Sequence, residues 1–177
     1  MKKLLFSAFL ILVLSATIIS CNDKDYTKDK AGEETKSMDP AADLWSRISG
    51  YQNWSHWPGK QPFYKGTEPH GFLLSTYLNE PAYKALTGGS AELPYGSIVI
   101  KENYKPDKTL AAVTVMERIK GYNPDAGDWY WAKYKADGSL HTKEVDGKAM
   151  KLAGKVGGCI GCHTASTSGV KYIMTPK

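Results

Sequence analysis

Two cysteines three positions apart, with a histidine directly after the second, stand near the end of the chain as Cys159-Ile160-Gly161-Cys162-His163. Thiols at this spacing reach the two vinyl groups on one edge of a porphyrin, and the adjoining imidazole then binds the iron. The motif therefore predicts one covalently attached haem c per chain. Cys159 and Cys162 form the thioether bonds in this interpretation, and His163 is the proximal iron ligand.

Two other uses of paired cysteines fit the sequence less well. A structural zinc site needs four nitrogen or sulfur ligands, and the chain has no second cysteine pair. A thioredoxin-like redox pair stands at the start of a helix after an early strand. Here the pair stands near the C-terminus, in a glycine-rich run. The sequence therefore favours haem attachment over zinc binding or a disulfide.

The third cysteine, Cys21, follows a segment typical of protein export. A positively charged start precedes a nearly continuous apolar run at 4–14. A helix of that length spans only about 16 Å of a bilayer core about 30 Å thick, so residues 1–20 are predicted to be a signal peptide. The run ends in two aliphatic residues, a serine and Cys21, which resembles a bacterial lipobox. We expect a lipid on Cys21 that anchors the protein to a membrane of the bacterial cell envelope, facing the periplasm or in the outer membrane. A stray cysteine in an ordinary secreted protein is the alternative.

Charge and composition limit the remaining possibilities. The formal net charge is +5, and the loss of Lys2 and Lys3 with the signal peptide would leave +3. That charge is mild and scattered, so it does not indicate a nucleic-acid partner. After the acceptor cysteine, the segment up to residue 38 is mostly polar and is predicted to be a flexible tether. Residues 39–177 are long enough for one buried core, and we expect a single haem domain there.

The pattern along this domain is mixed. Asp39-Pro40 predicts the start of a short helix that Gly50 ends. Runs rich in β-branched and aromatic residues, separated by turn signals, predict successive antiparallel strands. The expected strands are 71–79, 97–102, 110–119 and 128–134, and further short helices are expected at 81–86 and 149–155. The fold class is therefore α+β, a mainly antiparallel sheet with a few short helices and the haem attached near the C-terminus. An all-helical cytochrome c or a four-helix bundle does not fit this pattern.

Lys101 follows three consecutive β-branched residues in the second of these strands. Strand alternation places it on one face with Val99, while Ile98, Ile100 and Glu102 share the other face. Periodicity alone leaves two interpretations open. Lys101 is either the exposed end of its strand or a residue that contacts the haem.

A second axial iron ligand has several candidates, which are His56, His70, His141, Met116, Met150 and Met174. Methionines in apolar patterns usually fill cores, and His56 and His141 have polar neighbours typical of a surface. His70, beside a proline and before a strand, is the best distal candidate, with an ordinary loop histidine as the alternative. Trp129 and Trp131 share one strand face and are expected to be core aromatics beside the porphyrin rather than redox relays.

Four blocks in this order support a family resemblance. They are Pro69-His70-Gly71, the strand Gly96-Ser97-Ile98-Val99-Ile100-Lys101-Glu102, the block Gly127-Asp128-Trp129-Tyr130-Trp131, and the terminal haem motif followed by Tyr172 and Thr175. Together they resemble the cytochrome P-460 family, which includes the cytochrome c′-beta proteins. The resemblance spans about 45–175, nearly the whole predicted domain.

The resemblance implies a sheet-based, commonly dimeric haem domain. Its iron is bound by His163, and the opposite side lacks a strong protein ligand. Lys101 matches a lysine that is joined covalently to the porphyrin edge in the members that oxidise hydroxylamine. The c′-beta branch lacks this bond and binds small gases such as nitric oxide or carbon monoxide.

One departure from the enzymatic pattern concerns a carboxylate. The hydroxylamine-oxidising members place one in the distal pocket, on the strand that follows the lysine strand, where it relays protons. Here that strand has only Glu117, near its far end, and Glu102 is predicted to point away from Lys101. This puts hydroxylamine oxidation in doubt.

Three functions remain open at this stage. The first is redox chemistry on a small nitrogenous ligand, hydroxylamine or nitric oxide, at an open haem site by a haem oxidoreductase. The second is electron transfer through a six-coordinate iron to an unidentified redox partner. The third is the binding of nitric oxide without turnover.

Overall fold

The computed structural model of the protein describes residues 39–167 and 169–174. The predicted signal peptide, the lipid acceptor Cys21 and the tether up to residue 38 lie outside the described residues. Within the described part, no helix is long and apolar enough to cross a membrane.

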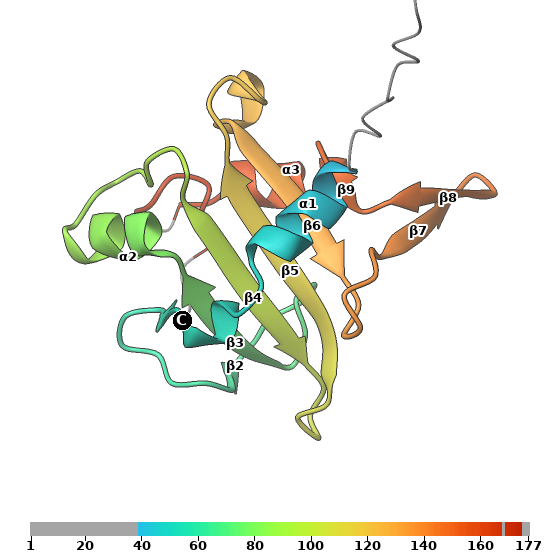
Figure 1. The fold of residues 1–177 in the computed structure, drawn as a ribbon, viewed down its shortest axis with the longest axis horizontal. Coiled ribbons are helices and arrows are strands. Elements are labelled where there is room, and N and C mark those ends of the chain that lie inside the picture. Colours follow the sequence, from blue (N-terminus) through green and yellow to red (C-terminus); the bar gives the residue numbers. More distant parts are fainter. Residues whose placement is uncertain (1–38, 168, 175–177) are drawn as a thin grey trace, which may run out of the picture. The chain divides into compact units, whose positions relative to one another are not determined.

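Within the described residues, seven strands form one antiparallel sheet in the order β1-β3-β4-β5-β6-β9, with β2 also pairing with β3. Figure 1 shows the long central strands side by side. The strand bounds are β1 Ser55–His56, β2 Tyr64–Lys65, β3 Leu73–Leu78, β4 Ile98–Tyr104, β5 Leu110–Arg118, β6 Trp129–Tyr134 and β9 Ala153–Gly154. The expected α+β class with a mainly antiparallel sheet is confirmed.

Short helices cover both faces of the sheet. Figure 1 shows α1, Pro40–Arg47, in front of the central strands and α3, Gly157–Thr164, behind them. Asp39 caps α1, since its carboxylate accepts a hydrogen bond from the backbone N–H of Ala41 at 3.0 Å. The helix α2, Glu80–Thr87, packs on the same side as α3 through the buried Ala82. Two single 3₁₀ turns, Tyr51–Asn53 and Pro124–Ala126, complete the described helical elements.

The two faces of the sheet differ in composition because successive side chains of a strand point to opposite sides. Residues that pair with each other across β4, β5 and β6 have their side chains on the same face of the sheet. We call one the tyrosine face, made of Ile98, Ile100, Glu102, Val113, Val115, Glu117, Tyr130, Ala132 and Tyr134. The other is the lysine face, made of Val99, Lys101, Asn103, Ala112, Thr114, Met116, Trp129, Trp131 and Lys133. Helix α1 packs on the tyrosine face, whereas α2 and α3 pack on the lysine face.

The predicted helix at 149–155 is wrong. Strands occupy most of this segment instead: it starts in the hairpin of β7 at Thr142–Val145 and β8 at Lys148–Lys151, and it continues through β9. The two residues between β7 and β8, Asp146 and Gly147, both have positive φ, at 50° and 72°. An Asp-Gly pair of this kind forms the tight turn that matches the twist of paired strands. The segment therefore starts in a hairpin and does not form a helix. The helix that follows begins later and contains the Cys-x-x-Cys-His motif itself.

The other predicted elements are present with small differences at their ends. The strands expected at 97–102, 110–119 and 128–134 correspond to β4, β5 and β6. The strand at 71–79 and the helix at 81–86 correspond to β3 and α2, and the first helix is α1.

Candidate haem site

The motif residues lie on one side of the short helix α3. Cys159 and Cys162 are three residues apart and His163 follows, so the helical repeat brings their side chains to neighbouring positions. Cys159 is half-buried, Cys162 is exposed, and both thiols are free. Burial raises the pKa of the Cys159 thiol. Two sulfurs and one imidazole therefore lie close together on α3.

The His163 ring is fixed by the segment that follows α3. The side chain is only 5% exposed, and its Nδ1 lies 2.7 Å from the backbone carbonyl oxygen of Tyr172. Since a carbonyl can only accept, Nδ1 carries the proton and donates it, which leaves the lone pair on Nε2. Burial lowers the pKa of His163, so the ring is neutral, the form that binds metals.

Tyr172 is itself held tightly. Its φ is 62°, a conformation uncommon for a tyrosine, and its ring lies over Gly127. A Cβ at Gly127 would lie 2.2 Å from the Tyr172 ring, so only glycine allows this contact. The turn before β6 therefore positions the carbonyl that orients His163.

Lys101 lies on the lysine face and is 8% exposed. The interpretation of Lys101 as an exposed strand end is therefore wrong, because both faces of β4 are covered. Its Nζ lies 3.5 Å from the backbone oxygen of Met174, and none of the described carboxylates pairs with it. Burial without an anionic partner lowers the pKa of Lys101 to about 8. At pH 7 a pKa of about 8 leaves roughly a tenth of this amine unprotonated, far more than for an ordinary lysine.

His70 reaches the same face from the loop between β2 and β3. Its Nδ1 lies 3.3 Å from the Thr114 hydroxyl, and its ring centre lies 6.1 Å from that of His163. Burial, followed by the charge of Lys101, lowers the pKa of His70 to about 3, so the ring is neutral. The structure thus brings together Lys101, His70 and His163, which the sequence predicted as separate candidates.

The remaining candidates for a second axial ligand lie in other environments. Met116 is buried in the apolar cluster on the lysine face, whereas Met150 and Met174 are exposed. His56 packs against the Tyr77 ring, with 4.7 Å between ring centres. His141 is half-buried, and its Nε2 has no partner among the described residues.

A model of the Cytochrome P460 family matches residues 48–175. The chain belongs to the Cytochrome P460 family. Among the curated proteins, none matches this cytochrome. Membership makes it a c-type haem protein, and the match extends over the sheet, Lys101 and the motif of α3.

Two buried polar atoms on the lysine face lack hydrogen-bond partners among the described residues, which is consistent with a haem that binds there. Trp131 Nε1 is buried and has no hydrogen-bond partner in the described residues, and the ring centre of Trp131 lies 6.4 Å from that of His163. Asn103 Oδ1 is also buried and unpaired among the described residues. Native cores rarely leave such atoms unsatisfied, so this region is suited to an additional group. His163, Cys159 and Cys162 would hold the haem, which supplies a redox-active iron that binds small ligands.

The carboxylates of the central strands lie away from Lys101. Glu102 points to the tyrosine face, as predicted, and Glu117 is on that face too. The Arg47 guanidinium donates two hydrogen bonds to Glu117, at 2.9 and 2.7 Å. The described part of the lysine face therefore has no carboxylate, and the predicted orientation of Glu102 away from Lys101 is confirmed.

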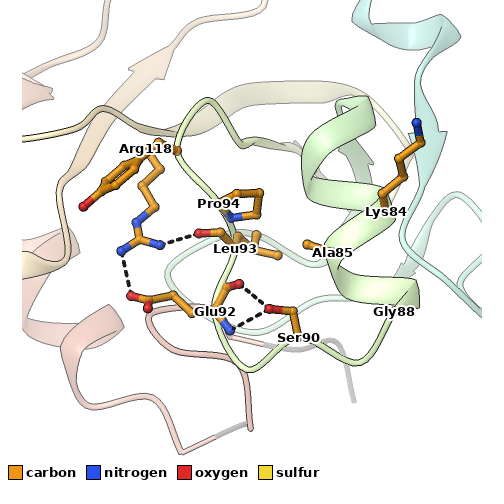
Figure 2. A pocket seen from close by; sticks show the side chains of 9 residues that line it. Lys84, Ala85, Gly88, Ser90, Glu92, Leu93, Pro94 and Arg118 are labelled. Atoms are coloured by element: carbon orange, nitrogen blue, oxygen red, sulfur yellow. Dashed lines mark hydrogen bonds and ion pairs between the residues drawn. The ribbon is translucent and has the colours of Figure 1, made fainter.

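A separate cavity of about 690 Å³ is formed by residues from α2, the segment before β4 and the end of β5. Figure 2 shows Arg118 in this cavity, directed at Glu92 and at the Leu93 carbonyl. Arg118 also donates to the Gly127 carbonyl at 3.0 Å, and its guanidinium stacks on the Tyr95 ring. Both cations that line the cavity are thus engaged, since Lys84 pairs with Glu80. It contains none of the haem-site residues.

Several contributors to the site were missed in the sequence. Thr114 and Asn103 were not recognised because nothing local marks them as neighbours of His70. The Tyr172 carbonyl was also missed, although Tyr172 belongs to the blocks of the family resemblance. The alternation of side chains along a strand was the one available signal. It places Asn103 on the same face as Lys101, and the register of β4 with β5 places Thr114 there too.

Proposed function

We propose that this cytochrome is an envelope-anchored monohaem protein that binds a small nitrogenous ligand, hydroxylamine or nitric oxide, and changes its redox state. The observation that supports this most is a neutral, oriented His163 close to a buried lysine that lacks an anionic partner. The first provides an iron ligand, and the second places beside the cofactor an amine that loses its proton more easily than an ordinary lysine.

Covalent attachment at Cys159 and Cys162 is the first part of the proposal. Each thiol adds across one vinyl group, so a sulfur–carbon bond forms and no electrons are exchanged. The mature protein is expected to keep one haem after denaturation in acid, as measured by intact mass. The double variant C159A/C162A should lose it. Haem that dissociates from the wild type in acid would contradict covalent attachment.

A bond between Lys101 and the porphyrin edge is the second part. Its formation removes one hydrogen from Nζ and one from a porphyrin carbon, and two electrons pass to an oxidant of the peroxide class. The lowered pKa of Lys101 supports this because only the unprotonated amine is nucleophilic. Tryptic digestion should yield a haem peptide that carries the Lys101 segment as well as 159–163. Lys133→Met, on the same face, is the matched control and should keep the bond.

Turnover is tested with the purified haem protein. Hydroxylamine and an electron-accepting dye should give dye reduction that depends on Lys101 and persists in Lys133→Met. Reduced protein should also bind nitric oxide or carbon monoxide, as measured by absorption. Absence of ligand binding with haem attached would overturn the proposal. Binding without dye reduction would instead favour a c′-beta-like protein that holds nitric oxide, in line with a lysine face that has no carboxylate.

Electron transfer is the second candidate function. It is favoured by His70, whose ring lies close to that of His163 as a second ligand would. In that case an unidentified redox partner exchanges electrons with the haem, and exogenous gases bind slowly or not at all.

Localisation and assembly complete the proposal. A lipid on Cys21 would hold the protein at a bacterial membrane, facing the periplasm or in the outer membrane, and family membership supports a homodimer. Metabolic labelling with a radioactive fatty acid is expected to mark the wild type and not Cys21→Ser.

A further inference from the structure

The hairpin of β7 and β8 lies outside the core of the domain. Figure 1 shows it projecting from the side of the main sheet, and within the described residues it forms a separate two-stranded sheet. All four residues of each strand are exposed to solvent. An isolated two-stranded ribbon is only marginally stable in water, so a hairpin of this kind is expected to gain from a surface that covers it.

One face of this hairpin combines basic and apolar side chains, and we call it the basic hairpin face. It holds the cross-strand pairs Lys143–Met150 and Val145–Lys148, since paired residues point to the same side. Met150 is 54% exposed and Val145 is 39% exposed. These two apolar residues are diagonal neighbours across the strands, within reach of each other. The opposite face is made of Thr142, Glu144, Ala149 and Lys151.

The lysines of the basic hairpin face have no ionic partner among the described residues. None of the ion pairs there involves Lys143 or Lys148. By contrast, Lys151 on the opposite face pairs with Asp39 at 2.5 Å. Two unpaired cations beside two exposed apolar side chains are typical of a surface that binds anionic membranes. The lysines contact the lipid headgroups, and the apolar groups enter the boundary beneath them.

The pair of Asp39 with Lys151 also determines where the chain enters the domain. Asp39 is the first described residue and is bonded to β8, so the segment before it joins the domain beside the hairpin. Asp39 follows the proposed lipid acceptor Cys21 by eighteen positions. A segment of that length extends at most roughly 65 Å. A lipid on Cys21 would therefore keep the hairpin near the membrane surface, where even a weak contact persists because it is intramolecular in effect.

We propose that the basic hairpin face docks on the anionic headgroup surface of the membrane that holds the lipid. This inference rests on the lipid anchor at Cys21, which is part of the proposed function, and it adds an orientation in which the hairpin faces the bilayer. A second copy of the chain fits this face less well. A two-fold contact would bring the face against itself, and the lysines at 143 and 148 of the two copies would repel each other.

Lysine accessibility gives the direct test, using the lipidated haem protein in vesicles. An acetylating reagent, followed by digestion and mass spectrometry, measures the reaction of each lysine separately. Lys143 and Lys148 should react roughly tenfold more slowly in vesicles that contain phosphatidylglycerol than in neutral phosphatidylcholine vesicles. Added salt should restore their reaction because it screens the headgroup charge. Lys105 and Lys120, which are exposed and lie outside the hairpin, are the internal reference and should react alike in both.

Removal of the apolar pair tests the same contact without a change of charge. Val145→Ser combined with Met150→Ser should bring the reaction of Lys143 and Lys148 on phosphatidylglycerol vesicles to within about twofold of that on neutral vesicles. Ile119→Ser is the matched control, since Ile119 is 37% exposed and lies outside the hairpin. It should keep the slow reaction. The haem absorption spectrum of each variant should match the wild type, which excludes unfolding as the cause.

The outcomes separate this inference from the proposed function. Equal reaction of the hairpin lysines in both kinds of vesicle overturns docking and leaves the anchor intact. Slow reaction that persists in neutral detergent micelles assigns the face to a second copy of the chain and also overturns docking.

A protein that does not sediment with neutral vesicles contradicts the lipid anchor alone. Such a protein should still sediment with phosphatidylglycerol vesicles, and Lys143→Gln combined with Lys148→Gln should abolish this. Failure of the wild type to sediment with either kind of vesicle overturns docking together with the anchor.

Discussion

Two neighbouring residues on β4, Lys101 and Glu102, are both buried but are satisfied in opposite ways. Glu102 accepts hydrogen bonds from the hydroxyls of Tyr51, Tyr77 and Tyr104, at 2.8, 3.0 and 2.6 Å. Within the described residues, the Lys101 amine has one hydrogen bond, to the backbone oxygen of Met174 at 3.5 Å. One residue of separation along a strand is enough to place the two groups in different environments.

The same contrast extends across the two faces. On the tyrosine face Glu117 is paired with Arg47, and the Tyr134 hydroxyl donates to the Ala41 carbonyl at 2.7 Å. On the lysine face Trp131 Nε1 and Asn103 Oδ1 are buried and unpaired within the described residues. The tyrosine face is complete as a protein core, whereas the lysine face is shaped for the cofactor of the family. Three measurements test this contrast.

Removal of the Glu102 carboxylate should have the largest effect. Glu102→Ala leaves three hydroxyls without their acceptor, and hydrogen bonds to charged groups contribute roughly 1.5–3 kcal/mol each, so we expect a loss of roughly 3 kcal/mol or more. Urea unfolding of the haem protein measures it. The control is Glu80→Ala, which removes the exposed partner of Lys84 and should leave the unfolding free energy nearly unchanged. A loss below about 1 kcal/mol for Glu102→Ala would mean that the tyrosine cluster does not support the fold.

The second-largest effect is expected at alkaline pH, which should lower the unfolding free energy through the tyrosine face. Burial and the nearby Glu102 charge raise the pKa of Tyr77 to about 12, against an ordinary value of 10.0. The Tyr77 phenol stays protonated to a higher pH in the folded protein than in the unfolded chain. Its contribution to the unfolding free energy is therefore complete below pH 10 and is lost as the pH rises towards 12. Unfolding free energies measured across this window should fall less steeply in Tyr77→Phe than in the wild type. Equal slopes in the two proteins would count against the raised pKa of Tyr77.

Trp131→Phe should have the smallest effect. The change removes an N–H that has no acceptor in the described protein and keeps most of the ring, so the unfolding free energy should fall by less than about 1 kcal/mol. The same urea titration measures it beside Glu102→Ala. A loss as large as that of Glu102→Ala would show that the lysine face is as fully satisfied as the tyrosine face, and would remove the contrast.

Much of the sheet was predictable because strands carry their signal locally. Alternation placed Val99 with Lys101 and separated them from Glu102, and this follows from the period of an extended chain. The segment 149–155 was not predictable in the same way: its composition suited a helix, and the Asp146-Gly147 turn was overlooked. Burial of Lys101 was also undecidable from periodicity, because a strand pattern does not say whether its second face is covered.

The sequence by itself determined the haem motif, the order of the main strands and the opposite orientation of Lys101 and Glu102. These depend on spacings of a few residues, which covalent geometry transmits directly. Only the tertiary structure decided that the His70 ring lies beside that of His163, that Tyr172 orients His163, and that tyrosines from three segments meet at Glu102. Such contacts join residues far apart in the chain, and they are set by how the loops and helices pack on the two faces of the sheet.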